Sequence, residues 1–201
     1  MTPTSVDRTL LWDLSDRLGL RAALNRIYRV QVRGGERIPA SGPCILVANH
    51  ESVVDPWFLA LATKRRIRYM AKAELWGNPI MARIFDSWGA FPVERGTGDT
   101  AAIGRAGELL EAGELLGVFP RGTSKPDGNR IWHRGAARLA LAYGVPLLPV
   151  RLEATRALHR RGPVVILVGE PIEVERTRPT IAAAKSLTSQ AEAAVEALAI
   201  P

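Results

Sequence analysis

The sequence feature that most constrains the fold is a regular alternation of short apolar runs with longer amphipathic stretches. The runs are typical of buried strands, and the stretches between them have helical spacing. We predict strands at 43–48, 67–71, 89–93, 115–119, 145–152 and 164–168. We predict helices from 55 onward, near 79–85, and at 99–112, 135–143 and 180–198. Strands that alternate with helices predict a single α/β domain with a largely parallel or mixed sheet flanked by helices.

The N-terminus follows a different pattern. Leucines 10, 11, 14 and 18 share one helical face, Gly19 interrupts it, and a second face starts at Leu20 with arginines opposite. We therefore expect an N-terminal amphipathic helical segment at 1–30, followed by one α/β domain at 31–201. A basic amphipathic segment either lies in a membrane interface or packs on the body of the protein.

The charge of the chain points to an anionic partner. It carries 27 basic and 20 acidic residues, a net charge of +7. The candidates are nucleic acid, a membrane surface and a phosphorylated small molecule, and the alternative is a solvated surface. Because no nucleic-acid-reading module or interleaved aromatic pattern is present, we expect no nucleic-acid partner. The densest basic run, at 64–68, either contacts anionic headgroups or CoA phosphates or forms a solvated face.

The sequence also bears on where the protein is located and on which cofactors it can bind. Aspartates interrupt the N-terminal apolar residues and no apolar run reaches about 18 residues, so we expect peripheral membrane contact from the cytoplasmic side. The single cysteine, Cys44, excludes an internal disulfide framework and favours a core residue. We expect no metal site and no dinucleotide site, since no ligand cluster or G-x-G-x-x-G pattern is present. The sequence does not indicate an oligomeric state.

Two residues form a candidate dyad. His50 follows the first predicted strand, and Asp55 opens the next helix, where Asp is a favoured N-cap and Pro56 suits the first helical position. A histidine acts as a general base when a carboxylate fixes its tautomer and stabilises the imidazolium. A short loop can bring these two side chains together, although the pair alone also fits a structural histidine.

Four ordered blocks then identify a resemblance. Residues 49–55 read Asn-His-Glu-Ser-Val-Val-Asp, and residues 89–95 read Gly-Ala-Phe-Pro-Val-Glu-Arg. Residues 119–123 read Phe-Pro-Arg-Gly-Thr, and residues 145–150 read Val-Pro-Leu-Leu-Pro-Val. These resemble, in order, the N-H-x4-D, G-x-x-F-[IV]-x-R, F-P-E-G-T-R-S and V-P-[IV]-[IV]-P-V blocks of the 1-acyl-glycerol-3-phosphate acyltransferase-like family. The resemblance covers roughly residues 30–175.

The resemblance implies acyl transfer from acyl-CoA or acyl carrier protein to the free hydroxyl of a lysophospholipid, in the first place 1-acylglycerol-3-phosphate to phosphatidic acid. His50 would be the general base and Asp55 its partner, with no acyl-enzyme and no cofactor. Arg95 would bind the acceptor's phosphate, or form a surface ion pair. The remaining implied substrate-binding residues are Asn49, Lys72, Arg121, Gly122, Thr123, Ser124 and Lys125, and the backbone near Gly122 is a candidate oxyanion site.

The third block departs from the family pattern. The usual Glu is Arg121, and the usual Arg is Ser124, which Lys125 follows. One interpretation is a relocated phosphate contact, and another is a different lysolipid or polar lipid acceptor. A third is a catalytically weak lipid-binding protein of the same fold. Near this block, His133 is a candidate cleft residue without a family role, and we expect His159 to be exposed.

Overall fold

The computed structural model describes residues 10–94, 100–124, 131–160 and 162–200. Within them lies one seven-stranded sheet with the order β1-β7-β6-β2-β5-β3-β4. The strands are β1 (Gln31–Arg33), β2 (Cys44–Ala48), β3 (Ile67–Lys72), β4 (Ala90–Val93), β5 (Leu115–Val118), β6 (Leu147–Glu153) and β7 (Val165–Val168). The six predicted strands are thus confirmed, and the predicted α/β class with them.

The sheet is mixed. Strands β6, β2, β5, β3 and β4 run parallel to one another, whereas β7 is antiparallel to β6 and pairs in parallel with β1. Strand β1 was not expected. It has only three residues, all exposed, and so lacks the apolar run that marks the other strands.

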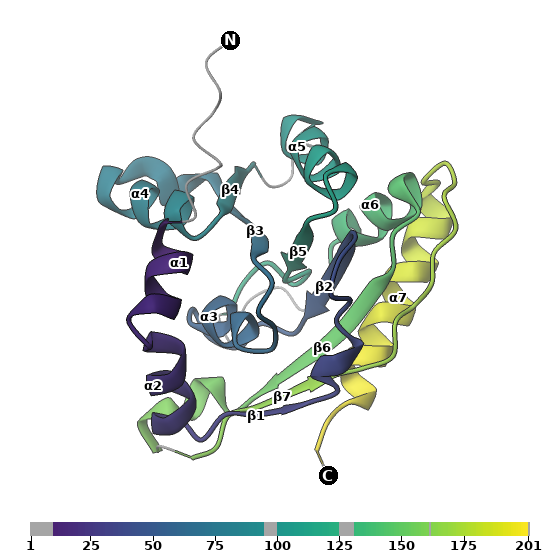
Figure 1. The fold of residues 1–201 in the computed structure, drawn as a ribbon. Coiled ribbons are helices and arrows are strands. Elements are labelled where there is room, and N and C mark those ends of the chain that lie inside the picture. The colour runs from purple at the N-terminus through teal and green to yellow at the C-terminus, as the bar shows by residue number, and fades with distance from the viewer. Residues whose placement is uncertain (1–9, 95–99, 125–130, 161, 201) are drawn as a thin grey trace.

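Seven α-helices and three 3₁₀ segments accompany these strands in the described ranges, with α1 and α2 before the first strand and α7 after the last (Figure 1). The α-helices are α1 (Leu10–Arg17), α2 (Leu20–Ile27), α3 (Asp55–Ala60), α4 (Pro79–Ser87), α5 (Thr100–Glu111), α6 (Gly135–Tyr143) and α7 (Ile181–Ala197). The 3₁₀ segments are η2 (Gly35–Arg37), η3 (Ala73–Gly77) and η4 (Thr155–Arg160). The predicted helices are confirmed, but the predicted cap of α5 at Asp99 lies outside the described residues.

Alternate residues of β2 enter two cores, as the period of a strand requires. Cys44, Leu46 and Ala48 belong to the core that includes α3 and Trp12, and Ile45 and Val47 belong to the one that includes α5, α6 and α7. All five are buried. Helices therefore cover both faces of the sheet, with α7 on one side and α1 to α3 on the other (Figure 1).

Cys44 is a core residue, as predicted. It is 1% exposed, and burial raises the pKa of its thiol to about 12. A thiol that stays protonated at neutral pH is a poor nucleophile.

Two arginines of the basic run at 64–68 have a structural role, which corrects the expectation of a ligand contact or a solvated face. Arg65 donates to the backbone carbonyls of Pro39, Gly42 and Gly113 at 2.8 Å each. Arg68 is 5% exposed and pairs with Glu114 at 3.0 Å. These partners precede β2 and β5, so both arginines lie near the points where those strands begin and hold the loops there.

The N-terminal segment forms two helices separated by Gly19, which has a φ of 67°. Trp12 of α1 is 2% exposed within the core, and Arg21 of α2 donates to the carbonyls of Ala60 and Thr63. Other apolar side chains stay outside, among them Leu18 at 74% exposure and Ile27 at 55%. The segment therefore packs on the body through one face and presents apolar side chains on another.

Candidate active site

The predicted site residues that the structure describes lie where the parallel strands end. Because β2, β5, β3 and β4 are parallel, their carboxyl ends lie on the same side of the sheet. The loop after β2 begins with Asn49, the loop after β5 begins with Phe119, and Lys72 ends β3. In α/β sheets, ligands bind outside the carboxyl ends of the strands. This side of the sheet is therefore the candidate active site.

His50 and Asp55 are in direct contact. The Nδ1 atom of His50 lies 2.8 Å from Oδ2 of Asp55. The His50 side chain is 17% exposed, whereas Asp55 is fully buried. A carboxylate that accepts from Nδ1–H leaves Nε2 as the proton-accepting nitrogen of a neutral imidazole. The pair thus has the geometry of a carboxylate-oriented base.

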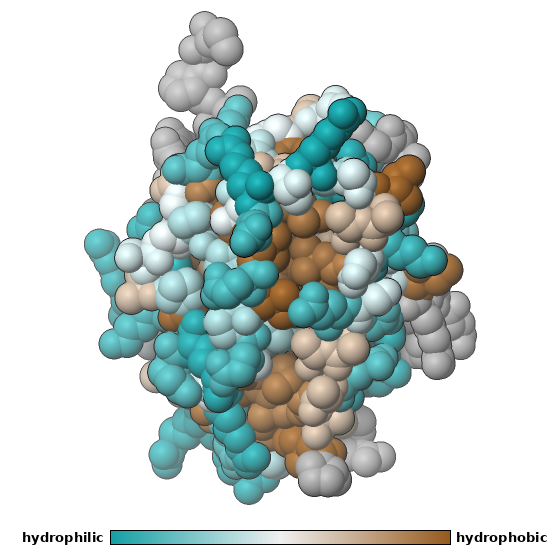
Figure 2. Space-filling view, turned by 90° about the vertical axis from the view of Figure 1, so that its right-hand side faces the viewer, coloured by the Kyte–Doolittle hydropathy of each residue, from teal (hydrophilic) through white to brown (hydrophobic). Residues whose placement is uncertain are grey.

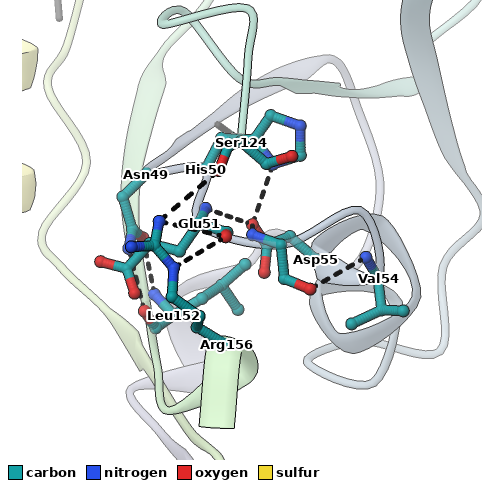
Figure 3. A network of polar contacts seen from close by, with 9 residues as sticks. Asn49, His50, Glu51, Val54, Asp55, Ser124, Leu152 and Arg156 are labelled. Atoms are coloured by element: carbon teal, nitrogen blue, oxygen red, sulfur yellow. Dashed lines mark hydrogen bonds and ion pairs between the residues drawn. The ribbon is translucent and has the colours of Figure 1, made fainter. Parts of the chain in front are cut away.

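Asp55 is not the N-cap that the sequence predicted. Helix α3 begins with Asp55 itself, its N-cap residue is Val54, and no side chain caps it. Instead the carboxylate turns back over the loop, where Oδ2 also accepts from the backbone N–H groups of Glu51 at 2.6 Å and Ser52 at 2.8 Å (Figure 3). Since one oxygen holds both the loop and the imidazole, the loop conformation and the histidine orientation depend on the same group.

The other oxygen of Asp55, Oδ1, is buried and has no hydrogen-bond partner among the described residues. A buried carboxylate oxygen without a partner is unfavourable for stability. A catalytic role is one explanation for a buried polar group of this kind.

An aromatic stack supports the imidazole. The ring of His50 lies 4.5 Å from that of Phe119, centroid to centroid, and Phe119 stacks on Tyr69 at 6.4 Å. The hydroxyl of Tyr69 donates to the carbonyl of Pro56 at 2.8 Å. Gly117 makes room for this stack, because a Cβ there would lie 2.5 Å from the Tyr69 ring. Phe119 opens the third block, but the sequence pattern alone assigned it no role.

Asn49 is held by the neighbouring strand. Its Nδ2 donates to the carbonyl of Leu152 at 2.9 Å, and its Oδ1 accepts from the N–H of Leu152 at 2.8 Å. Both polar atoms of the side chain therefore fasten the start of the His50 loop to β6. Its predicted contact with substrate stays a prediction.

The third block lies beside the loop that carries His50. Gly122 takes a φ of 69° and donates to the carbonyl of Phe119, which closes a tight turn after β5. Arg156 donates to the carbonyl of Glu51 at 3.3 Å and to that of Ser124 at 3.5 Å, and so bridges the first and third blocks (Figure 3). No sequence pattern connects Arg156 with residues so far away in the chain.

Arg121 is half-buried, and its Nε has no hydrogen-bond partner among the described residues. Its charge acts on α7. Burial and neighbouring Glu196 raise the pKa of Glu192 there, and Arg121 lowers it. The arginine that replaces the family's glutamate is thus within electrostatic reach of an acidic part of α7.

The remaining predicted residues are distributed as follows. Lys72 is exposed at the end of β3, Thr123 is half-buried in the third block, and Arg95 and Lys125 lie outside the described residues. His133 lines a cavity of about 770 Å³ beside Phe119, and its place in a substrate cleft stays a prediction. Nothing is described of the His159 side chain. Among the described residues, no three histidine, cysteine or acidic side chains come together as a metal site would require.

Described residues form two cavities, of which the larger lies beside the site. The larger one, of about 770 Å³, lies between β5 and helices α5, α6 and α7. The smaller, of about 330 Å³, is an apolar groove between α1, α2, α3 and Trp88. No described helix is both long enough and apolar enough to span a bilayer.

Comparison with known proteins gives consistent results. A family model described as Acyltransferase matches residues 29–153. A 1-acyl-sn-glycerol-3-phosphate acyltransferase of Bacillus subtilis is 30% identical over 157 residues, which cover 76% of this chain and 78% of that protein. A chloroplastic 1-acyl-sn-glycerol-3-phosphate acyltransferase of Brassica napus is 27% identical, over 72% of this chain but only 45% of its own length.

A solved structure shares the fold. The 1-acyl-sn-glycerophosphate acyltransferase from Thermotoga maritima superposes with a TM-score of 0.65. The match covers 90% of this chain and 79% of that one, at 24% sequence identity.

Proposed function

Because this chain belongs to the Acyltransferase family, we propose that it is an O-acyltransferase acting on a lysophospholipid. The acyl donor is a thioester, acyl-CoA or acyl carrier protein, and the acceptor is 1-acylglycerol-3-phosphate, which becomes phosphatidic acid. The single observation that carries this proposal is the 2.8 Å contact between His50 Nδ1 and Asp55 Oδ2 at the carboxyl ends of the parallel strands. The names of the relatives support the choice of acceptor.

In the proposed reaction, His50 and Asp55 act as one unit. Asp55 accepts from Nδ1–H, and Nε2 takes the proton of the acceptor hydroxyl as its oxygen attacks the thioester carbonyl. The tetrahedral intermediate collapses, the C–S bond breaks, and the thiolate leaves and takes up the proton. Phe119 packs against the imidazole and limits its rotation. The backbone turn at Gly122 is a candidate donor set for the oxyanion.

The reaction needs no cofactor, because the thioester supplies a good leaving group and the histidine supplies the base. Cys44 is no candidate nucleophile, since it is buried in β2. We therefore assign direct transfer between the two substrates.

A second candidate, transfer to a different lysolipid or polar lipid, is favoured by the third block. The position of the family's arginine holds Ser124, whose carbonyl accepts from Arg156. The position of the family's glutamate holds Arg121, whose charge acts on Glu192 of α7. A catalytically weak lipid-binding protein is the third candidate.

A panel of lysolipids tests these alternatives. We expect the purified protein to release free thiol from a long-chain acyl-CoA when lysophosphatidate is offered in vesicles, and to do so more slowly with other lysolipids. Acyl carrier protein is the second donor to supply. Preference for another lysolipid would favour the second candidate, and no turnover with either donor would support the third.

The same assay applied to Arg121→Glu, with and without Ser124→Arg, tests the third block. We expect acceptor preference to move toward lysophosphatidate in the double variant, since it restores the family's Glu and Arg. Arg121→Gln is the control, because it removes the charge near Glu192 without adding a carboxylate. Unchanged preference in both variants would contradict the assignment of this block to acceptor binding.

We also propose that α1 and α2 hold the protein on the inner face of the cell membrane, without spanning it. The apolar groove between α1, α2 and α3 is lined by Leu14, Leu18, Trp57 and Trp88, and several of these side chains are partly exposed. Exposed leucines and tryptophans beside arginines suit the boundary between headgroups and acyl chains. The lipid substrate would then reach the site from the bilayer.

A point substitution tests this better than removal of the segment, because removal would uncover the core against which Trp12 is buried. We expect Leu18→Asp to lower co-sedimentation with anionic vesicles several-fold. Ile80→Asp is the matched control, since Ile80 is 66% exposed against 74% for Leu18, lies on α4 and lines neither cavity. Equal losses in the two variants, or none in Leu18→Asp, would contradict a specific role of this segment.

A further inference from the structure

The cavity of about 770 Å³ beside the candidate active site has an apolar inner wall and exposed arginines. Its inner wall is apolar, with Ile103, Val118 and Ala184 among its residues. Arg134 and Arg138 line it as exposed cations, and Glu94 is the carboxylate among its described lining residues. Figure 2 shows apolar surface bordered by hydrophilic side chains on the side of the molecule where α6 and α7 lie. An amphipathic anion fits such a lining.

The N-terminus of α6 opens into this cavity. Gly135 and Ala136, the first two residues of the helix, line it, and the N-cap residue Arg134 makes no side-chain cap to the first turn. A Cβ added to Gly135 would meet no atom within 4 Å, so the space before the helix is open. The first backbone N–H groups and the positive end of the helix dipole favour a phosphate here.

The N-terminus of α7, which lines the same cavity, has a side-chain cap, whereas the N-terminus of α6 has none. At α7, the side chain of Thr180 accepts from the N–H of Ala183 and so caps the first turn. The end of α6 has two arginines beside it instead of a cap, and a guanidinium group is suited to a bidentate contact with phosphate. The backbone N–H of His133 donates to the carbonyl of Pro120, which fixes this end of α6 against the third block.

One residue lies between the cavity and the dyad. Phe119 lines the cavity, and its ring lies 4.5 Å from that of His50. Pro120 and Gly122 of the third block line it as well. The cavity lies on the face of the sheet that α5, α6 and α7 cover, and Phe119 packs against the core of the other face. A ligand whose anionic group is held at α6 would therefore reach His50 by passing over Phe119 at the carboxyl end of β5.

We propose that this cavity binds the phosphate-bearing part of a substrate, with Arg134, Arg138 and the first turn of α6 as its phosphate site. The proposal rests on the proposed acyl transfer and deepens it by naming residues outside the four blocks. Both the glycerophosphate of the acceptor and the nucleotide of acyl-CoA carry the required phosphate ester. Arg134 and Arg138 would supply the cationic contact that Ser124 cannot.

Kinetics with the intact protein test the proposal and separate the two sources of phosphate. We expect Arg134→Gln and Arg138→Gln each to raise KM for one substrate, acceptor or donor, about tenfold, as for the loss of one charge-assisted hydrogen bond. The kcat should change much less, and Arg134→Lys should recover part of the loss. Arg33→Gln is the matched control, since Arg33 is an exposed arginine on β1, the edge strand farthest from β4 in the sheet.

Binding of two probes supplies a readout that does not need turnover. Glycerol 3-phosphate represents the acceptor and 3′,5′-ADP the donor, each titrated calorimetrically into wild type and variants. Weaker binding of one probe in both arginine variants, but not in Arg33→Gln, would support the site and identify its source. If wild type turns over and neither KM nor either probe responds to the variants, the phosphate site is wrong while the acyl transfer stands. If probe binding responds to the variants but wild type does not turn over, the phosphate site stands while the acyl transfer is contradicted.

Discussion

Replacing His50 with alanine is expected to lower the kcat of acyl transfer by about 10²- to 10⁴-fold, the usual contribution of a general base. The imidazole is half-buried, oriented by Asp55 and packed against Phe119, so its loss removes the group that these neighbours position. Thiol release from acyl-CoA at saturating lysolipid measures this directly. The KM values should change little, because the alanine variant keeps the arginines and the apolar cavity walls.

The control for this prediction is His159→Ala, a histidine substitution in η4 to which we assign no role. It should retain kcat within about twofold of wild type, since the base removed from the other variant is still present. Both variants should unfold at similar denaturant concentrations. A fully active, folded His50→Ala variant would exclude the histidine as the base, and loss of activity in both variants would point to a damaged fold.

Substitution of Asp55 is expected to have the second largest effect, on activity and on stability. Asp55→Asn should lower kcat by about 10²- to 10⁴-fold, because a neutral amide neither stabilises the imidazolium nor enforces the tautomer. Asp55→Ala should also destabilise the fold by about 2–4 kcal/mol, since the N–H groups of Glu51 and Ser52 lose their shared acceptor.

The two variants together separate orientation from loop anchoring. Asn keeps an acceptor oxygen for the loop, so urea unfolding should show a smaller loss of stability for Asp55→Asn than for Asp55→Ala. The unpartnered Oδ1 of Asp55 has the opposite effect on stability. Replacing Asp55 with alanine removes the cost of burying this carboxylate oxygen without a hydrogen bond. An Asp55→Ala variant as stable as wild type would mean that this relief cancels the lost hydrogen bonds. Wild-type kcat in either variant would contradict the dyad.

The features that could be predicted from the sequence are those that depend on short stretches of the chain. The alternation of apolar runs and helical stretches indicated the six longer strands, the helices and the α/β class, because the periods of strands and helices are visible within a few residues. The spacing from His50 to Asp55 could be assessed in the same way, since both lie in one short loop. The ordered blocks indicated the family. The role of Asp55 at the helix start was nevertheless wrong, because its carboxylate binds the loop behind it instead of capping α3.

Other features depend on contacts between distant parts of the chain. We expected the basic run at 64–68 to be a solvated or ligand-binding surface, and this was wrong for Arg65. The loops before β2 and β5 meet beside Arg65, and it donates hydrogen bonds to three of their backbone carbonyls. Arg134 and Arg138 lie close to the third block only because α6 packs beside the turn after β5. A sequence pattern of a few residues contains no record of such contacts.

By itself, then, the sequence determined the six longer strands, the α-helices, the α/β class and the candidate pair His50 and Asp55, because each of these is visible among neighbours in the chain. Only the tertiary structure decided that β7 runs antiparallel to β6, that Leu152 holds Asn49, and that Phe119 lies against His50. These contacts join residues from different strands and loops, and no local periodicity records them, because they arise from the order in which the strands are packed into the sheet.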